Sequence, residues 1–143
     1  MRPPDESKRD LVRQWVTKAE KDFSLAQHLV AEGCFYREAI CFNSQQTAEK
    51  LLKGFLGMHQ VDFPKTHNLG ELLDLVAAVD HLLADALREV TALNPYGVEY
   101  RYPGDSPELT GEDAQAAFRL AEMAHAAVQP KLSAFLGGAP LPR

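Results

Sequence analysis

The sequence lacks the features that define several large protein classes. No apolar run approaches the roughly 20 residues needed to cross a bilayer, so we expect no membrane association. Residues 1–6 have no apolar segment typical of a signal peptide, and we therefore place the protein in the cytoplasm. Cys34 and Cys41 are too few for a disulfide framework or a zinc cluster, and we expect them to be reduced thiols with one or both in the core.

Sequence motifs of common catalytic centres are also missing. We find no glycine-rich phosphate loop, no nucleophile elbow and no zinc-ligand spacing. Glu122 and His125 have the i,i+3 spacing of metal-binding helical bundles, but such sites need two of these pairs and two further carboxylates. We therefore expect no metal and no cofactor. The formal net charge of −5 argues against a general basic surface, so any nucleic-acid site must be local.

The pattern that the sequence does contain is helical. Apolar residues recur at intervals of three and four, and no strand-like alternation of useful length occurs. The 45% hydrophobic and 24% charged residues are typical of a globular protein, and 143 residues suit one domain. We predict an all-α fold, an antiparallel up-and-down bundle of four long helices plus one short helix. The domain covers residues 7–136, between a disordered leader (1–6) and a flexible tail (137–143).

Capping residues suggest where these helices begin and end. Gly33 is a plausible left-handed cap, Thr66 or Asn68 can start the third helix, and Asp80 can start the fourth. Thr110 and Asp113 resemble a capping box for the last helix. The expected helices cover about residues 7–33, 35–58, 69–79, 83–93 and 110–135.

The last helix has an apolar seam with alternating spacings of four and three, rich in alanine. Such a seam suits close packing against a second chain, and we expect a homodimer. Pro130 is expected to kink this helix or to end its straight part. The seam contains Ala114, Phe118, Ala121, His125, Val128, Leu132 and Phe135.

The second helix has a polar side at the edge of the predicted core. Two amides, a carboxylate and two lysines gather there, and they can order a network or bind a polyanion. The alternative is a solvated face with one i,i+4 amide pair. These residues are Gln45, Gln46, Glu49, Lys50 and Lys53.

Two further groups are candidates for a binding site. His67 follows Thr66 at the start of the third helix, in the fixed geometry of a helix entrance. Arg101 stands between Tyr100 and Tyr102 in the one long loop, a combination that suits base stacking and phosphate binding. The alternatives are a histidine that bonds only to a neighbouring loop, and tyrosines that pack over the end of the bundle.

Together, these residues resemble the HEPN domain family. The resemblance rests on Gln-Gln-Thr-Ala-Glu-Lys-Leu-Leu-Lys at 45–53, Lys-Thr-His-Asn-Leu at 65–69 and Arg-Tyr-Pro at 101–103, in that order. With Trp15, Ala19 and Asp22 it covers about residues 11–128. It implies an all-helical homodimer, often encoded beside a small nucleotidyltransferase as a toxin-antitoxin pair. Members of the family are described as nucleotide-binding, RNA-binding or metal-independent endoribonucleases.

For the nuclease members, the resemblance implies an arginine and a histidine on the C-terminal helix that meet across the dimer interface. Arg119 and His125 fit the required spacing, although Leu120 stands where a polar residue is usual. The histidine would act as acid or base, and the arginine would stabilise the phosphorane charge. Six residues place the two side chains about 120° apart around a helix, so they would converge across chains or through a distortion.

Three functional hypotheses follow. The glutamine-rich helix and the Arg-Tyr-Pro loop look more like the nucleotide-binding branch, which predicts a nucleotide- or RNA-binding module acting with a nucleotidyltransferase. The second hypothesis is the ribonuclease toxin, and the third is a helical scaffold for dimerisation or partner binding. For the first, we expect phosphate binding by Lys50, Lys53, His67, Arg101 and Tyr102, with a supporting polar network of Gln45, Gln46, Glu49 and Thr66.

Overall fold

The computed structural model describes residues 4–97 and 108–137. All regular structure in this part of the chain is helical, as predicted, and no strand occurs in it. Three long helices, α1 (Pro4–Ala31), α2 (Arg37–Met58) and α5 (Gly111–Phe135), accompany three short ones. The short ones are α3 (Leu69–Ala77), α4 (His81–Ala86) and the 3-10 helix η1 (Arg88–Tyr96).

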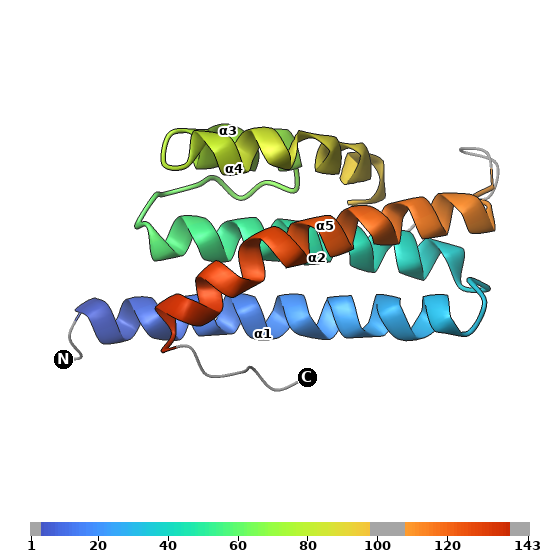
Figure 1. The fold of residues 1–143 in the computed structure, drawn as a ribbon, viewed down its shortest axis with the longest axis horizontal. Helices are drawn as coiled ribbons and strands as arrows, with labels where there is room; N and C mark the ends of the chain where they lie inside the picture. Colours follow the sequence, from blue (N-terminus) through green and yellow to red (C-terminus); the bar gives the residue numbers. More distant parts are fainter. Residues whose placement is uncertain (1–3, 98–107, 138–143) are drawn as a thin grey trace.

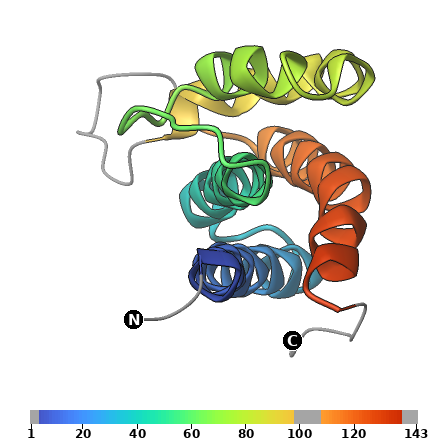
Figure 2. The ribbon, with the colours of Figure 1, turned by 90° about the vertical axis from the view of Figure 1, so that its left-hand side faces the viewer.

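Helix α2 lies in the middle of the molecule. In Figures 1 and 2, α1 lies on one side of α2, while α3, α4 and η1 form a layer on the opposite side. Helix α5 runs along α2 and contacts both α1 and η1 (Figure 2). Because α2 contacts all its neighbours, 14 of its residues are buried, including polar ones.

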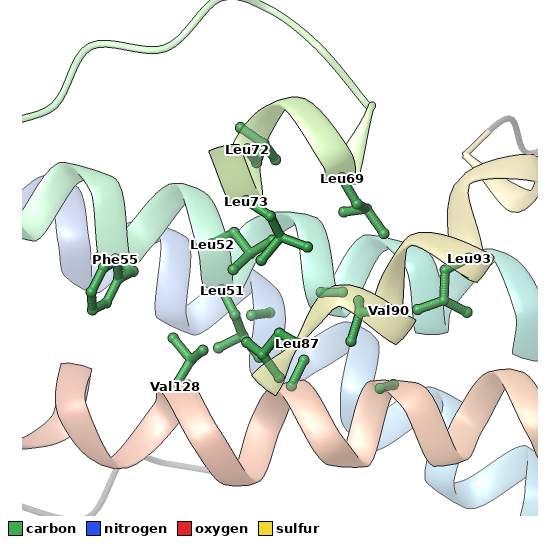
Figure 3. Packing of buried hydrophobic residues seen from close by; sticks show 14 of the residues in the cluster. Leu51, Leu52, Phe55, Leu69, Leu72, Leu73, Leu87, Val90, Leu93 and Val128 are labelled. Atoms are coloured by element: carbon green, nitrogen blue, oxygen red, sulfur yellow. The ribbon is translucent and has the colours of Figure 1, made fainter. Parts of the chain in front are cut away.

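The core is formed by aliphatic side chains from every layer. Figure 3 shows leucines of α2 and α3 meeting Leu87, Val90 and Leu93 from the short layer and Val128 from α5. Each of these side chains is at most 1% exposed. Burial of one such side chain contributes about 1.5–3 kcal/mol, so this contact between layers fixes α3 on α2.

The fourth predicted helix is divided into α4 and η1. Leu87, Val90 and Leu93 are spaced by exactly the three residues that a 3-10 helix places on one face, and all three are buried. Pro95, inside η1, lacks the backbone N–H that an α-helix would require. The bundle therefore has three long helices and a layer of short ones, where we expected four long helices and one short.

Most predicted caps are present. Gly33 has φ +105°, Asp80 accepts from Leu83 N, and Thr110 with Asp113 forms the capping box. Of the two candidates for the third helix, the N-cap is Asn68. The first helix begins at Pro4, not Ser7, and proline is favoured at a first helical position. Helix α5 continues through Pro130 to Phe135.

The apolar seam of α5 packs inside its own chain. Ala114, Ala121, Val128 and Leu132 are fully buried, and Phe118 is 7% exposed. The seam is therefore not available as a dimer interface. The homodimer stays a prediction, and the spacing of apolar residues in α5 no longer supports it. Cys34 and Cys41 are buried and are not joined in a disulfide, as expected. None of the described helices is long and apolar enough to cross a membrane.

Candidate functional site

A buried carboxylate, Glu49, organises the polar side of α2. Its side chain is only 4% exposed. Gln45 Nε2 donates to Glu49 Oε1 over 3.2 Å, and His67 Nδ1 lies 2.9 Å from the same oxygen. Lys53 Nζ donates to Glu49 Oε2 over 3.0 Å. Both oxygens of the carboxylate are thus engaged, as a buried charge requires.

Helical spacing explains how three of these groups meet. Gln45, Glu49 and Lys53 are four residues apart, so they lie above one another on one face of α2. His67 comes from the segment before α3, and Gln45 Nε2 also donates to the His67 backbone carbonyl over 3.0 Å. Gln46 Nε2 donates to Gln45 Oε1 over 2.7 Å and fixes the amide orientation. The network therefore ties the entrance of α3 to α2.

The position of His67 is also fixed from the α3 side. Asn68 Oδ1 accepts from Gly70 N over 2.8 Å and from Glu71 N over 3.4 Å, which caps the helix. Thr66 Oγ1 accepts from Asn68 N over 3.0 Å. Thr66 thus supports the turn that carries His67, and does not itself contact Glu49 in the described part of the chain.

The charge of Lys53 is compensated within the protein. Its side chain is 9% exposed, and its ammonium lies 5.6 Å from the Trp15 ring centre and 5.9 Å from that of Phe63. With Glu49 as ion partner and two aromatic faces beside it, Lys53 is part of the enclosed network. These contacts place Lys53 in the Glu49 network, and its role as a phosphate ligand stays a prediction.

Lys50 lies elsewhere. It donates to Asp22 of α1, and both side chains are 19% exposed. This contact points toward α1, which lies on the side of α2 away from α3 (Figure 2). The structure thus does not bring Lys50 to the His67 network. Arg101 and Tyr102, the other two predicted ligands, lie outside the described residues.

Beside the network is a recess of about 290 Å³, which we call the His67 recess; its lining residues are His67, Asn68, Asn94, Pro95 and Gly97. The His67 side chain is 69% exposed there. A carboxylate paired with Lys53 can only accept hydrogen bonds, so His67 Nδ1 is the donor to Glu49. The other ring nitrogen, Nε2, can then bond to a ligand. The recess therefore offers an oriented imidazole next to a buried ion pair.

Asn94 is a site residue that the sequence reasoning missed. Its Oδ1 accepts from Leu69 N over 2.8 Å, and its Nδ2 donates to Asn68 Oδ1 over 3.4 Å. These bonds hold the end of η1 against the start of α3 and shape the recess. The available signal was an asparagine directly before Pro95, since asparagine commonly bonds to backbone groups at such turns.

The second predicted pair does not meet within one chain. His125 Nε2 lies 2.6 Å from Glu20 Oε1, and its ring stacks on Phe23 with centres 4.1 Å apart. Arg119 is exposed and lies on another side of α5. Glu20, only 9% exposed, was also missed, because its partner comes from a helix 105 residues away.

The fold and this network define a class of protein: an all-helical bundle whose central helix carries a Gln-Glu-Lys face bonded to the histidine of a Thr-His-Asn helix entrance. The family model of the HEPN domain matches residues 12–131. The chain belongs to the HEPN domain family.

A solved structure agrees with this assignment. The chain is similar to the crystal structure of an archaeal HEPN homologue, with 26% sequence identity and a TM-score of 0.64. The match covers 85% of this chain and 97% of the other. No curated protein matches the sequence.

Proposed function

We propose that this protein binds a nucleotide, free or as part of an RNA, in the His67 recess. The observation that carries the proposal is the Glu49 network, which holds the His67 imidazole at the recess with Nε2 turned away from the carboxylate. An enclosed charge network that ends on an exposed, oriented imidazole is costly to build for stability alone. It is expected where a polar ligand must be recognised.

The lining of the recess suits a nucleotide. Pro95 offers an apolar ring to a base, and His67 Nε2 can bond to a base edge, a ribose hydroxyl or a phosphate oxygen. The segment with Arg101 and Tyr102 follows Gly97, which lines the recess. On the basis of the sequence, Arg101 is our candidate for a bidentate phosphate ligand. As part of the same proposal, the protein acts as a homodimer with a small nucleotidyltransferase partner.

Calorimetric titration with ATP and UTP tests this proposal. We expect saturable binding that His67→Ala weakens by at least tenfold, because the variant removes the one exposed side chain that both lines the recess and joins the network. His81→Ala is the matched control, since His81 is also exposed and bonded to a carboxylate, Asp85, but lies on α4. Equal affinity in wild type, His67→Ala and His81→Ala would reject the site. Absence of any binding would favour the scaffold hypothesis.

A second function, metal-independent RNA cleavage, is favoured by the geometry of His125. Its imidazole is oriented by Glu20 and by stacking on Phe23, and 21% of the side chain is exposed. Such fixation suits a general acid or base. Since Arg119 lies on another side of α5, the pair needs a second chain. RNA cleavage in the presence of EDTA, lost in His125→Ala, is the expected result for this function, and an inactive wild type contradicts it.

A further inference from the structure

The outward face of α1 is a second place where polar side chains surround a hollow. The hollow measures about 420 Å³ and is lined by Asp10, Arg13, Gln14, Thr17, Lys18 and Lys21. These positions follow one another at intervals of three and one residues, so each lies three or four residues from another member and they share one side of the helix. Helix α1 and the layer of short helices lie on opposite sides of α2 (Figures 1 and 2), so this surface is separate from the His67 recess.

This surface keeps positive charge in an acidic protein. Three carboxylates of this part of α1 have partners: Asp10 pairs with Arg13 over 3.2 Å, Asp22 pairs with Lys50, and Glu20 lies within hydrogen-bond distance of His125. Lys18 and Lys21 are exposed, and neither has a carboxylate partner in residues 6–97 and 108–137. A local cationic surface on a chain with a net charge of −5 is the kind of site that attracts a polyanion.

The lining also distinguishes between two kinds of polyanion. Arginine, lysine, glutamine and threonine are the side chains that commonly contact phosphate and sugar oxygens of nucleic acids. In the described part of the chain, every side chain that lines the hollow ends in a polar or charged group, whereas the centre of a protein interface is typically apolar and aromatic. Arg13 and Lys21 are eight residues apart, which is about 12 Å along the helix axis. A line of charges of this length fits successive phosphates better than a single one.

We propose that this face of α1, here called the α1 basic face, binds the sugar-phosphate backbone of single-stranded RNA. Lys18 and Lys21 neutralise phosphates, and Gln14 and Thr17 donate hydrogen bonds to backbone oxygens. The proposal goes beyond the His67 recess, since backbone binding on α1 needs no nucleotide in the recess. A local site of this kind is also consistent with the net charge of −5, which argues against a general basic surface.

Fluorescence anisotropy with a labelled oligouridylate of about 12 nucleotides tests the proposal, since this length suits sites of single-strand-binding proteins. The test variant is Lys18→Gln/Lys21→Gln. Both lysines are exposed on the helix, and glutamine has nearly the same helix propensity, so the fold should be kept, as circular dichroism can verify. The control is Arg88→Gln/Lys131→Gln, which removes two positive charges from η1 and α5, at side chains 42% and 47% exposed.

We expect the test variant to lose about tenfold in affinity, and the slope of log K against log salt to fall by about 1.4, because each phosphate contact on a single strand contributes about 0.7. The control should keep the wild-type affinity and slope. An unchanged slope in the test variant, or an equal loss in the control, would overturn the proposal. The proposal would also be overturned if the α1 variants changed the binding of a poly-glutamate peptide but not the binding of RNA. The partner of this face would then be an acidic protein.

The same variants separate this proposal from the one on the recess. ATP binding should be unaffected by Lys18→Gln/Lys21→Gln and weakened by His67→Ala. If ATP does not bind at all while RNA binding still depends on Lys18 and Lys21, the recess proposal fails and the α1 basic face stands. If ATP binding depends on His67 but RNA binding is unchanged in Lys18→Gln/Lys21→Gln, the recess proposal stands and the α1 basic face proposal fails.

Discussion

Glu49 is the residue on which the polar network of α2 depends, because three different side chains use its two oxygens. Lys53 donates to Oε2, while Gln45 and His67 share Oε1. A lone carboxylate or ammonium in this position would be costly, since both Glu49 and Lys53 are at least nine-tenths buried. Each charge is therefore stable only in the presence of the other.

This mutual dependence gives a prediction for stability. Glu49→Gln leaves Lys53 as a buried, uncompensated cation, and we expect a loss of about 3–5 kcal/mol in the free energy of unfolding, measured with urea. Glu49→Gln/Lys53→Met removes both charges and should recover part of the loss. Glu38→Gln, an exposed glutamate at the start of the same helix, is the control and should change stability by less than about 0.5 kcal/mol. A single Glu49→Gln variant as stable as this control would contradict the role of the pair.

Gly97 gives a prediction that separates stability from binding. Its φ of −69° suits any residue, and an added Cβ would lie 3.5 Å from both Gln45 Nε2 and His67 Cβ, which is ordinary contact. Gly97→Ala should therefore preserve the fold, with a gain of up to about 1 kcal/mol from the less flexible unfolded chain. Because the methyl group occupies part of the recess, nucleotide affinity should fall in titration calorimetry. Retention of full affinity would show that the ligand binds elsewhere.

At the scale of helices, the entrance of α3 positions the site. Asn68 caps α3 directly after His67, and Asn94 at the end of η1 bonds to both Asn68 and Leu69. Cap and binding group thus belong to one turn. A disturbance of this cap should affect stability and ligand binding together, while a cap elsewhere should affect stability alone.

Two N-caps allow this comparison. Asn68→Ala and Asp80→Ala each remove a side chain that accepts from a helix N-terminus, and each should cost about 1 kcal/mol in thermal unfolding. Only Asn68→Ala should also weaken ATP binding, because only that cap holds His67 at the recess. An equal loss of affinity in both variants would contradict the link between the α3 cap and the site. Unchanged affinity in both variants would contradict it as well.

For the molecule as a whole, the sequence predicted the features that repeat along a helix. The spacing of apolar residues gave the helical fold, and the i,i+4 positions of Gln45, Glu49 and Lys53 indicated the network. Contacts between residues far apart in the chain do not follow a periodic spacing in the sequence, and several of them were not predicted. The Glu20–His125 pair and the Asn94–Leu69 bond depend on packing, and the compensation of Lys53 by Trp15 and Phe63 depends on the same long-range contacts.

The seam of α5 shows why an apolar pattern by itself gives no evidence for a dimer. Alternating spacings of four and three describe a surface that packs closely against another helix, whether from the same chain or from a second one. Here the partners are α2 and α1 of the same chain, since Ala121, Val128 and Leu132 are fully buried without another copy. Periodicity alone cannot distinguish the two cases.

The most direct test of the central claim is a ¹H–¹⁵N correlation spectrum of the protein titrated with ATP. The claim is that the Glu49 network holds His67 at a nucleotide-binding recess between the entrance of α3 and the end of η1. It predicts saturable shifts concentrated in the amides of His67, Asn68, Asn94 and Gly97 and in the side-chain amide of Gln45. Shifts confined to α1 or α5, or a spectrum that does not change, would contradict it.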